Sequence, residues 1–557
     1  MSTNGAKHHL GPLAFGLGLY GLNNLGTVSG WWAPPPGYLP MFVTRQTDVA
    51  QYLTWIEAYR SQGPLLPDYH APWQTEPALF SPAMWLLSKA SGLLGIDGLT
   101  SYRLVHLLTY VIAAYALAFA IRTFTASRRE RWLAFVLMLC VVPLRTLRII
   151  PAILLNGDWD PVAALEKYRP WRGLIVGGTV DGFFHAIPGS MLATFGTGMT
   201  ILAFALLATY FNTGLRRHLA LFMTAVFVGA LLHPFEAFVI AGGASIALAL
   251  REPERWRDAL WEVGAVAISC AVGLAPHVYL VARHRWLRDV AASTDWYPGQ
   301  FITVMAHLGL PAILALTFLV LQPRMRAKTD LLLQSWFVCT LVGSYIPGLP
   351  WSQHLFDGFH YCTGLLLARQ LAGSRLVGKI ASSAPRFTVA ALGGWCILAL
   401  VPHAGARWQA FRDGNQAQPR FIPTTVAPSD EISAIHWLRQ HASPGALILA
   451  PELYAPWMAT VPMHSFGSHW MFSIAEKAQN SLANAFFDGR LDPQQASQLL
   501  DGYGVRYALV PNDSHATRYL RASDKRATIG ALTIYEFPAH SMSAYPATFN
   551  GTREPDS

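Results

Sequence analysis

The sequence is poor in charged residues. Asp, Glu, Lys and Arg make up 13% of its 557 residues, about half the share of a typical soluble domain. Hydrophobic residues make up 52%. This composition excludes an ordinary soluble protein and predicts a polytopic membrane protein followed by a soluble part. The formal net charge of +9 is explained better by basic cytoplasmic loops beside anionic lipid than by nucleic acid binding.

Cysteine is also scarce, and several common catalytic motifs are missing. The five cysteines lie in or beside apolar segments, and no two form a CxxC pair. A disulfide framework or a cysteine metal site is therefore not expected. The chain has no Walker loop and no HExxH or GxSxG motif. Nothing in it indicates nucleotide-driven chemistry on the cytoplasmic side.

Apolar segments of roughly bilayer-spanning length predict about 11 membrane helices. They cover approximately 10–29, 104–123, 132–147, 191–213, 219–233, 234–250, 259–281, 302–321, 331–349, 360–373 and 387–402. Lys7 and the positive clusters of alternate loops fall on one side of this arrangement, which the positive-inside rule makes cytoplasmic. We therefore expect a multi-pass membrane protein with a cytoplasmic amino terminus.

The same count places four loops and the carboxyl-terminal region outside the membrane. The loops are 30–103, 148–190, 282–301 and 350–359. The transmembrane domain covers 1–403, a polar linker 404–428, a soluble α/β domain 429–540 and a disordered tail 541–557. In the soluble domain we expect helices at 429–442, 474–489 and 492–504, and strands at 446–450, 505–511 and 527–537, because alternating helices and strands are typical of α/β domains.

The first outward loop, 31–100, contains a predicted amphipathic helix at 43–63. Its apolar and aromatic residues recur at helical spacing: Val49, Tyr52, Leu53, Ile56 and Tyr59. Asp48 lies at the start of this helix. The Pro-rich and aromatic segment after it carries His70 and Glu76. We expect a rigid helix that holds an acidic group at the outer membrane surface.

Basic residues on two outward loops break the positive-inside rule. They are Arg145 and Arg148 at the start of the second loop, 148–190, and Arg283, Arg285 and Arg288 in the third, 282–301. Arginine binds phosphate oxygens with two parallel hydrogen bonds, so a phosphate-bearing lipid head group would explain them. Ordinary solvation, or pairing with Glu166 and Asp289, is the alternative.

Acidic and histidine residues also gather near the outward side. Asp181 and His185 are spaced as neighbours on one helical turn of the second loop. His233 and Glu236 lie in the short turn LLHPFEAF, and Asp357 and His360 lie near the outer end of a span. Ionisable groups at membrane depth are costly and so are functional candidates. A purely structural turn held by Pro234 is equally consistent with the pattern.

These motifs together resemble the GT-C class of integral-membrane glycosyltransferases, in a poorly characterised bacterial branch. The resemblance is carried by TDVAQYLTWIEAYRSQG, TEPALFSPAMWLLSKASGLLG, LLHPF and FFDGRL…LLDGYGVRYALVP in this order. It implies a place in the bacterial inner (plasma) membrane, an external active site, a polyprenyl-phosphate-linked sugar donor and a glycan, lipid or protein acceptor. It also implies that Asp48 is the general base or orients the acceptor, assisted by Asp181 or His185.

The resemblance leaves metal dependence unassigned. The class often has two acids close together in the first loop, but Gln46 stands two residues before Asp48. No cofactor is certain, and a divalent metal lacks the support of a paired-acid motif. Two other functions remain open. One is a transporter or flippase, which should show internal repeats and interrupted helices; the other is a non-catalytic envelope-assembly protein.

Overall fold

The computed structural model describes residues 3–23, 38–40, 47–69, 76–139, 191–252, 254, 256–288, 301–321, 327–346, 355–356, 358–374, 379, 383, 394, 426–443, 445–451, 463–466 and 476–538. The chain is mostly helical and divides into two compact units. Unit 1 comprises Met1–Val28, Tyr102–Tyr279 and Thr294–Gly414. Unit 2 comprises Ser29–Ser101, Leu280–Ser293 and Asn415–Ser557.

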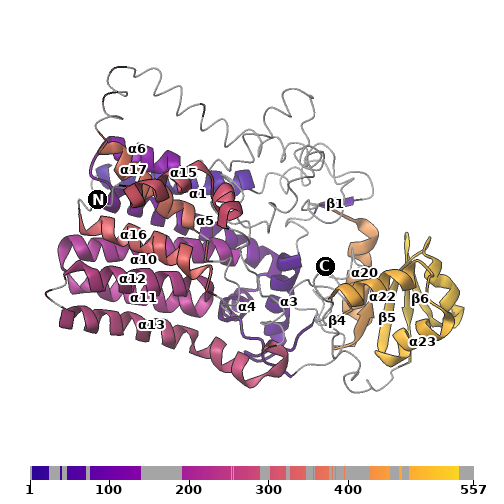
Figure 1. The fold of residues 1–557 in the computed structure, drawn as a ribbon. Helices are drawn as coiled ribbons and strands as arrows, with labels where there is room; N and C mark the ends of the chain where they lie inside the picture. The colour runs from indigo at the N-terminus through magenta and orange to yellow at the C-terminus, as the bar shows by residue number, and fades with distance from the viewer. Residues whose placement is uncertain are drawn as a thin grey trace. The chain divides into compact units, whose positions relative to one another are not determined.

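Unit 1 is built of helices at the predicted spans. They are α1 (Thr3–Asn23), α6 (Arg128–Leu139), α10 (Met191–Thr213), α11 (Arg216–Leu232), α12 (Phe235–Arg251), α15 (Phe301–Leu321), α16 (Lys328–Gly343) and α17 (Phe359–Ala372), together with most of α5 (Gly98–Phe124) and α13 (Trp256–Arg283). Figure 1 shows α10, α11, α12, α13 and α16 running side by side. Among the described residues, α5, α10 and α13 are long and apolar enough to cross a membrane. The span predicted at 387–402 lies outside the described residues, apart from Gly394.

Close helix packing and a few charged contacts hold unit 1 together. The rings of Phe204 and Trp336 stack with centroids 4.2 Å apart and join α10 to α16. Arg369 of α17 pairs with Asp330 of α16 and donates to the carbonyl oxygen of Phe124 at the end of α5. A buried charge is tolerated when it is paired and hydrogen-bonded in this way. The Arg369 contacts fix the ends of α5, α16 and α17 relative to one another, and the stacked rings join the middles of α10 and α16.

Unit 2 brings together segments that are far apart in the sequence. Strand β1 (Tyr38–Pro40) pairs antiparallel with β2 (Val426–Pro428), with Tyr38 opposite Pro428. The helices α3 (Thr47–Ser61) and α4 (Pro82–Leu94) follow β1. The backbone N–H of Ser465 donates to the carbonyl oxygen of Tyr69 at 2.9 Å. The first predicted outward loop is thus hydrogen-bonded to the carboxyl-terminal region.

The carboxyl-terminal region contains a small five-stranded sheet in the order β4-β3-β5-β7-β6. Its strands are β3 (Leu447–Leu449), β4 (His464–Ser465), β5 (Val505–Pro511), β6 (Lys525–Ile529) and β7 (Leu532–Glu536), and the helices are α20 (Ser429–His441), α22 (Glu476–Phe487) and α23 (Pro493–Gly502). Figure 1 shows these helices beside the strands. Strand β3 is parallel to β4 and β5, whereas β7 is antiparallel to β5 and β6.

One predicted strand is wrong. The run 527–537 is not a single strand but the hairpin of β6 and β7. The chain turns at Gly530, whose φ of 55° is accessible to glycine at little cost. The turn is fixed from outside the hairpin because Asp430 accepts a hydrogen bond from the backbone N–H of Ala531 at 2.8 Å.

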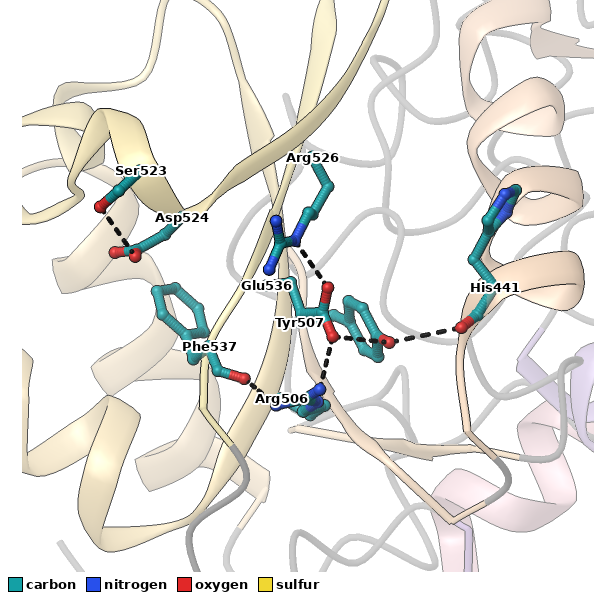
Figure 2. A network of polar contacts seen from close by, with 8 residues as sticks. All are labelled: His441, Arg506, Tyr507, Ser523, Asp524, Arg526, Glu536 and Phe537. Carbon is teal, nitrogen blue, oxygen red and sulfur yellow. Dashed lines mark hydrogen bonds and ion pairs between the residues drawn. The ribbon is translucent and has the colours of Figure 1, made fainter.

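A polar network around Glu536 joins three strands of this sheet (Figure 2). Its carboxylate accepts hydrogen bonds from Arg506 of β5 and, at 2.7 Å, from Arg526 of β6. The hydroxyl of Tyr507 lies 3.5 Å from Glu536 Oε1 and 3.5 Å from the carbonyl oxygen of His441. The register between β6 and β7 shifts at Arg526, and such bulges re-aim a side chain.

We expect Glu536→Ala to weaken the sheet by about 1 kcal/mol, because two arginines lose a shared, partly buried carboxylate. Hydrogen–deuterium exchange of the full-length protein should then be about fivefold faster in peptides from β5, β6 and β7. Asp488→Asn is the control, since Asp488 and its partner Arg490 are 57% and 64% exposed. Unchanged protection in Glu536→Ala would contradict a stabilising role for the network.

Candidate functional site

Helix α3 carries Asp48 in its first turn, and the Asp48 side chain lies outside the described residues. The prediction of a helix here is confirmed, but its amphipathic character is wrong. The polar residues Gln51 and Thr54 are 2% and 1% exposed, as buried as Val49 and Ile56. The helix is therefore a buried element of unit 2. Tyr52 is partly buried, with its ring 5.9 Å from that of Trp55.

The segment after α3 fixes this helix through hydrogen bonds to its carboxyl-terminal half. Ser88 Oγ donates to the carbonyl oxygen of Ile56 at 2.7 Å, and Lys89 Nζ donates to that of Tyr59 at 2.6 Å. The hydroxyl of Tyr59 accepts from the backbone N–H of Ser81 at 2.9 Å. Burial raises the pKa of Tyr59 above its ordinary value, so the hydroxyl stays protonated at neutral pH. Asp48 thus begins a helix with little freedom to move.

Glu76 lies against the basic segment that follows α13. Its carboxylate Oε2 is 3.1 Å from Nδ1 of His284, and its carbonyl oxygen accepts from Nε1 of Trp286 at 3.2 Å. The Glu76 side chain itself is 82% exposed. The three arginines of this segment are also exposed: Arg283, Arg285 and Arg288. The structure therefore places Glu76 against His284 and Trp286, in the segment that also carries the third-loop arginines, within unit 2.

His233 and Glu236 form a buried pair at the turn from α11 to α12. His233 Nδ1 lies 2.6 Å from Glu236 Oε2, and the two residues are 6% and 3% exposed. Gly196 of α10 faces them: a Cβ there would lie 2.3 Å from Glu236 Oε1 and 2.5 Å from His233 Nδ1. The edge of the Phe235 ring packs against the imidazole at a centroid distance of 5.0 Å. The structure therefore buries two ionisable side chains among the helices of unit 1.

Most of the other predicted site residues lie outside the described residues. These are Asp181 and His185 of the second loop, His70 of the first, Arg145, Arg148 and Asp357. His360 lies in the first turn of α17 and is partly buried, and its carbonyl oxygen accepts from Thr363 Oγ1 at 2.9 Å. His277 of α13 has Nε2 2.9 Å from the carbonyl oxygen of Leu231.

Asp68, in the same Pro-rich loop segment as His70 and Glu76, is 2% exposed. Sequence reasoning did not single out Gly196, which packs against the Glu236 carboxylate. Gly196 lies inside an apolar span and gives no local signal of the acid that it accommodates. Within the described parts of the chain, no group of three or more His, Cys, Asp or Glu side chains could hold a metal ion.

Comparison with solved structures shows which fold the chain has. No protein family and no curated protein matches the chain. Among solved structures, a mutant form of the arabinofuranosyltransferase AftD from Mycobacteria is 16% identical, with a TM-score of 0.53 over 95% of this chain and 41% of that one. The oligosaccharyltransferase of Archaeoglobus fulgidus is 11% identical, with a TM-score of 0.52 over 91% of this chain and 70% of that one. The chain thus spans less than half of the mycobacterial enzyme. At these identities the likeness shows the fold, and the chain shares the GT-C fold of integral-membrane glycosyltransferases.

Proposed function

We propose that this protein transfers a sugar from a polyprenyl-phosphate donor to a glycan, lipid or protein acceptor at the outer face of a bacterial inner membrane. The observation that carries the proposal is the fold shared with two solved glycosyltransferases over more than nine-tenths of the chain. The GT-C motifs of the sequence support it independently. An enzyme outside the cytoplasm has no nucleotide sugars at hand, which favours a lipid-linked donor.

The proposed topology has 11 spans, a cytoplasmic amino terminus and a carboxyl-terminal domain outside. The set of chain segments that forms unit 2 supports this topology. The first predicted outward loop, the segment Leu280–Ser293 and the carboxyl-terminal region all belong to this unit. Segments on opposite sides of a bilayer could not share one compact unit, because about 30 Å of hydrocarbon would separate them.

In the proposed reaction, Asp48 accepts the proton of the acceptor hydroxyl as that oxygen attacks the anomeric carbon of the donor sugar. The bond from the anomeric carbon to the phosphate oxygen breaks, and polyprenyl phosphate leaves. Arg283, Arg285 and Arg288 neutralise the departing phosphate, since donors aimed at developing charge are a large source of rate acceleration. Asp181 or His185 supplies a further polar group.

The lipid that accompanies the purified protein tests this proposal. We expect mass spectrometry of extracts from detergent-purified protein to show polyprenyl phosphate or its sugar conjugate. Addition of undecaprenyl phosphate to delipidated protein should raise the melting temperature, because a ligand that binds only the folded state stabilises it. Phosphatidylglycerol at equal concentration is the control. Equal stabilisation by both lipids, together with phospholipid alone in the extracts, would contradict the proposal.

A further inference from the structure

The two faces of α4 differ in exposure. One face is buried and consists of Met84, Leu87, Ser88 and Ser91. On the other face, Leu86, Leu93 and Leu94 are 53%, 89% and 72% exposed, and Ala90 is exposed between them. These four residues follow the spacing i, i+4, i+7 and i+8, so they form one stripe along the helix. We call them the leucine stripe.

The leucine stripe carries no charged or hydrogen-bonding side chain. Lys89 is the only charged residue of α4, and its Nζ donates to the carbonyl oxygen of Tyr59 of α3 at 2.6 Å. Ser88 Oγ likewise donates to the carbonyl oxygen of Ile56 of α3 at 2.7 Å. Helix α4 therefore binds α3 through its polar side chains and leaves its leucines exposed.

A short linker joins α4 to α5, which is long and apolar enough to cross a membrane. The linker is Gly95–Asp97, so the gap between the two helix ends is at most about 14 Å. Arg60 of α3 fixes the linker, because it donates to the carbonyl oxygen of Ile96 at 2.6 Å. Helix α5 has no Asp, Glu, Lys or Arg between Arg103 and Arg122. The leucine stripe therefore ends within roughly 20 Å of the point where the chain enters the hydrocarbon.

Lipid suits the leucine stripe better than a second protein does. An amphipathic helix at a membrane surface places its apolar face at the acyl boundary, and leucine gains free energy when it leaves water. In α4, the opposite face is covered by α3 rather than by water. A stable protein interface buries about 800 Å² on each partner, and three leucines on a helix of 13 residues offer much less.

We propose that the leucine stripe of α4 binds lipid acyl chains at the bilayer surface and holds α3 against the membrane. This lipid contact does not depend on the proposed sugar transfer. The surface helix expected at 43–63 is then α4, and α3 lies on the protein side of it. Because α3 is hydrogen-bonded to α4, the contact also sets the depth of α3, whose first turn carries Asp48.

Photocrosslinking of the full-length protein in phosphatidylcholine nanodiscs tests the contact. The photoreactive amino acid p-benzoylphenylalanine replaces Leu86 or Leu93, one position at a time. After irradiation, mass spectrometry identifies each adduct as lipid, as a second copy of the chain or as another segment of the same chain. Ile268 of α13 is the lipid-facing control, because it is 63% exposed in a helix able to span a membrane. Gln498 of α23 is the water-facing control, because it is exposed in the carboxyl-terminal region.

We expect lipid adducts at positions 86 and 93 to reach roughly half the yield at position 268 and roughly tenfold the yield at position 498. Lipid yields no higher than at position 498 would overturn the inference. Adducts formed mainly with a second copy, or with another segment of the chain, would also overturn it, because that protein surface would then cover the stripe.

Paired substitutions test whether the leucines hold α4 at the bilayer. Leu93→Gln combined with Leu94→Gln removes apolar surface at two exposed positions, and glutamine has a helix propensity similar to that of leucine. The lipid-adduct yield at position 86 should fall by roughly threefold or more, because burial in the acyl region favours leucine and disfavours an amide. Leu93→Met combined with Leu94→Met is the matched control and should keep the yield. Equal yields in the two pairs would overturn the inference.

Discussion

Asp48→Asn is expected to lower the rate of sugar transfer by about 10²–10⁴, because an amide cannot take the proton of the acceptor hydroxyl. Folding and donor affinity should be preserved, since the substitution changes one charge at the start of a helix. The measurement is transfer of radiolabelled sugar from a polyprenyl-phosphate donor in membranes of cells that lack the native gene. The loss should appear in kcat rather than in KM, because the carboxylate acts on the reacting proton.

Asp97→Asn is the control for this prediction. Asp97 is exposed and belongs to the same unit, and its Oδ1 accepts from the backbone N–H of Thr100 at 2.8 Å, at the start of α5. Asparagine caps a helix about as well as aspartate. The two variants therefore remove the same charge from the same unit, and only one of them should lose activity. Full transfer activity in Asp48→Asn membranes would refute the assigned role of Asp48.

Helix positions were readable from the sequence, but their surroundings were not. Apolar spacing located α3, yet the same spacing suits a helix on a membrane surface and a helix inside a domain. Thr54 shows why the pattern misled. Its hydroxyl donates to the carbonyl oxygen of Ala50 at 2.9 Å, so it can be buried at little cost. The hairpin at Gly530 was missed because apolar residues continue on both sides of the glycine, and only the glycine itself signals the turn.

The candidate site was only partly predictable for a related reason. His233 and Glu236 are three residues apart on the chain, so their contact follows from local spacing. The contact of Glu76 with His284 spans 208 positions, and that of Gly196 with the buried acid depends on how α10 crosses the α11–α12 turn. Such contacts arise from packing between helices. Residue types alone do not fix which helices meet.

Gly364→Ala is expected to cause a large loss of stability in unit 1. Gly364 of α17 meets α6 so closely that a Cβ would lie 2.7 Å from the backbone nitrogen of Met138 and 2.9 Å from the carbonyl carbon of Leu137. Backbone atoms cannot relieve the clash by a change of rotamer, so the two helices must separate. Overpacking of this kind costs about 1–3 kcal/mol. The melting temperature of the detergent-solubilised protein should fall by several degrees.

Gly264→Ala separates this effect from helix propensity. No atom lies within 4 Å of a Cβ at Gly264 of α13, and alanine favours a helix over glycine by about 1 kcal/mol. Gly364→Ala should therefore lower the melting temperature, whereas Gly264→Ala should raise it or leave it unchanged. Equal melting temperatures in the two variants would show that α6 and α17 do not cross at Gly364.

Met138→Ala tests whether the alanine at position 364 clashes with backbone atoms of α6 or with the Met138 side chain. A Cβ at position 364 would lie 2.7 Å from Met138 Cγ and also 2.7 Å from the backbone nitrogen of Met138. Met138→Ala removes the side-chain clash in the Gly364→Ala background but leaves the backbone clash unchanged. If the backbone decides the packing distance, the double variant recovers little of the lost melting temperature. If the flexible methionine decides it, recovery approaches the melting temperature of Met138→Ala alone, because the two substitutions then share one contact and are not additive.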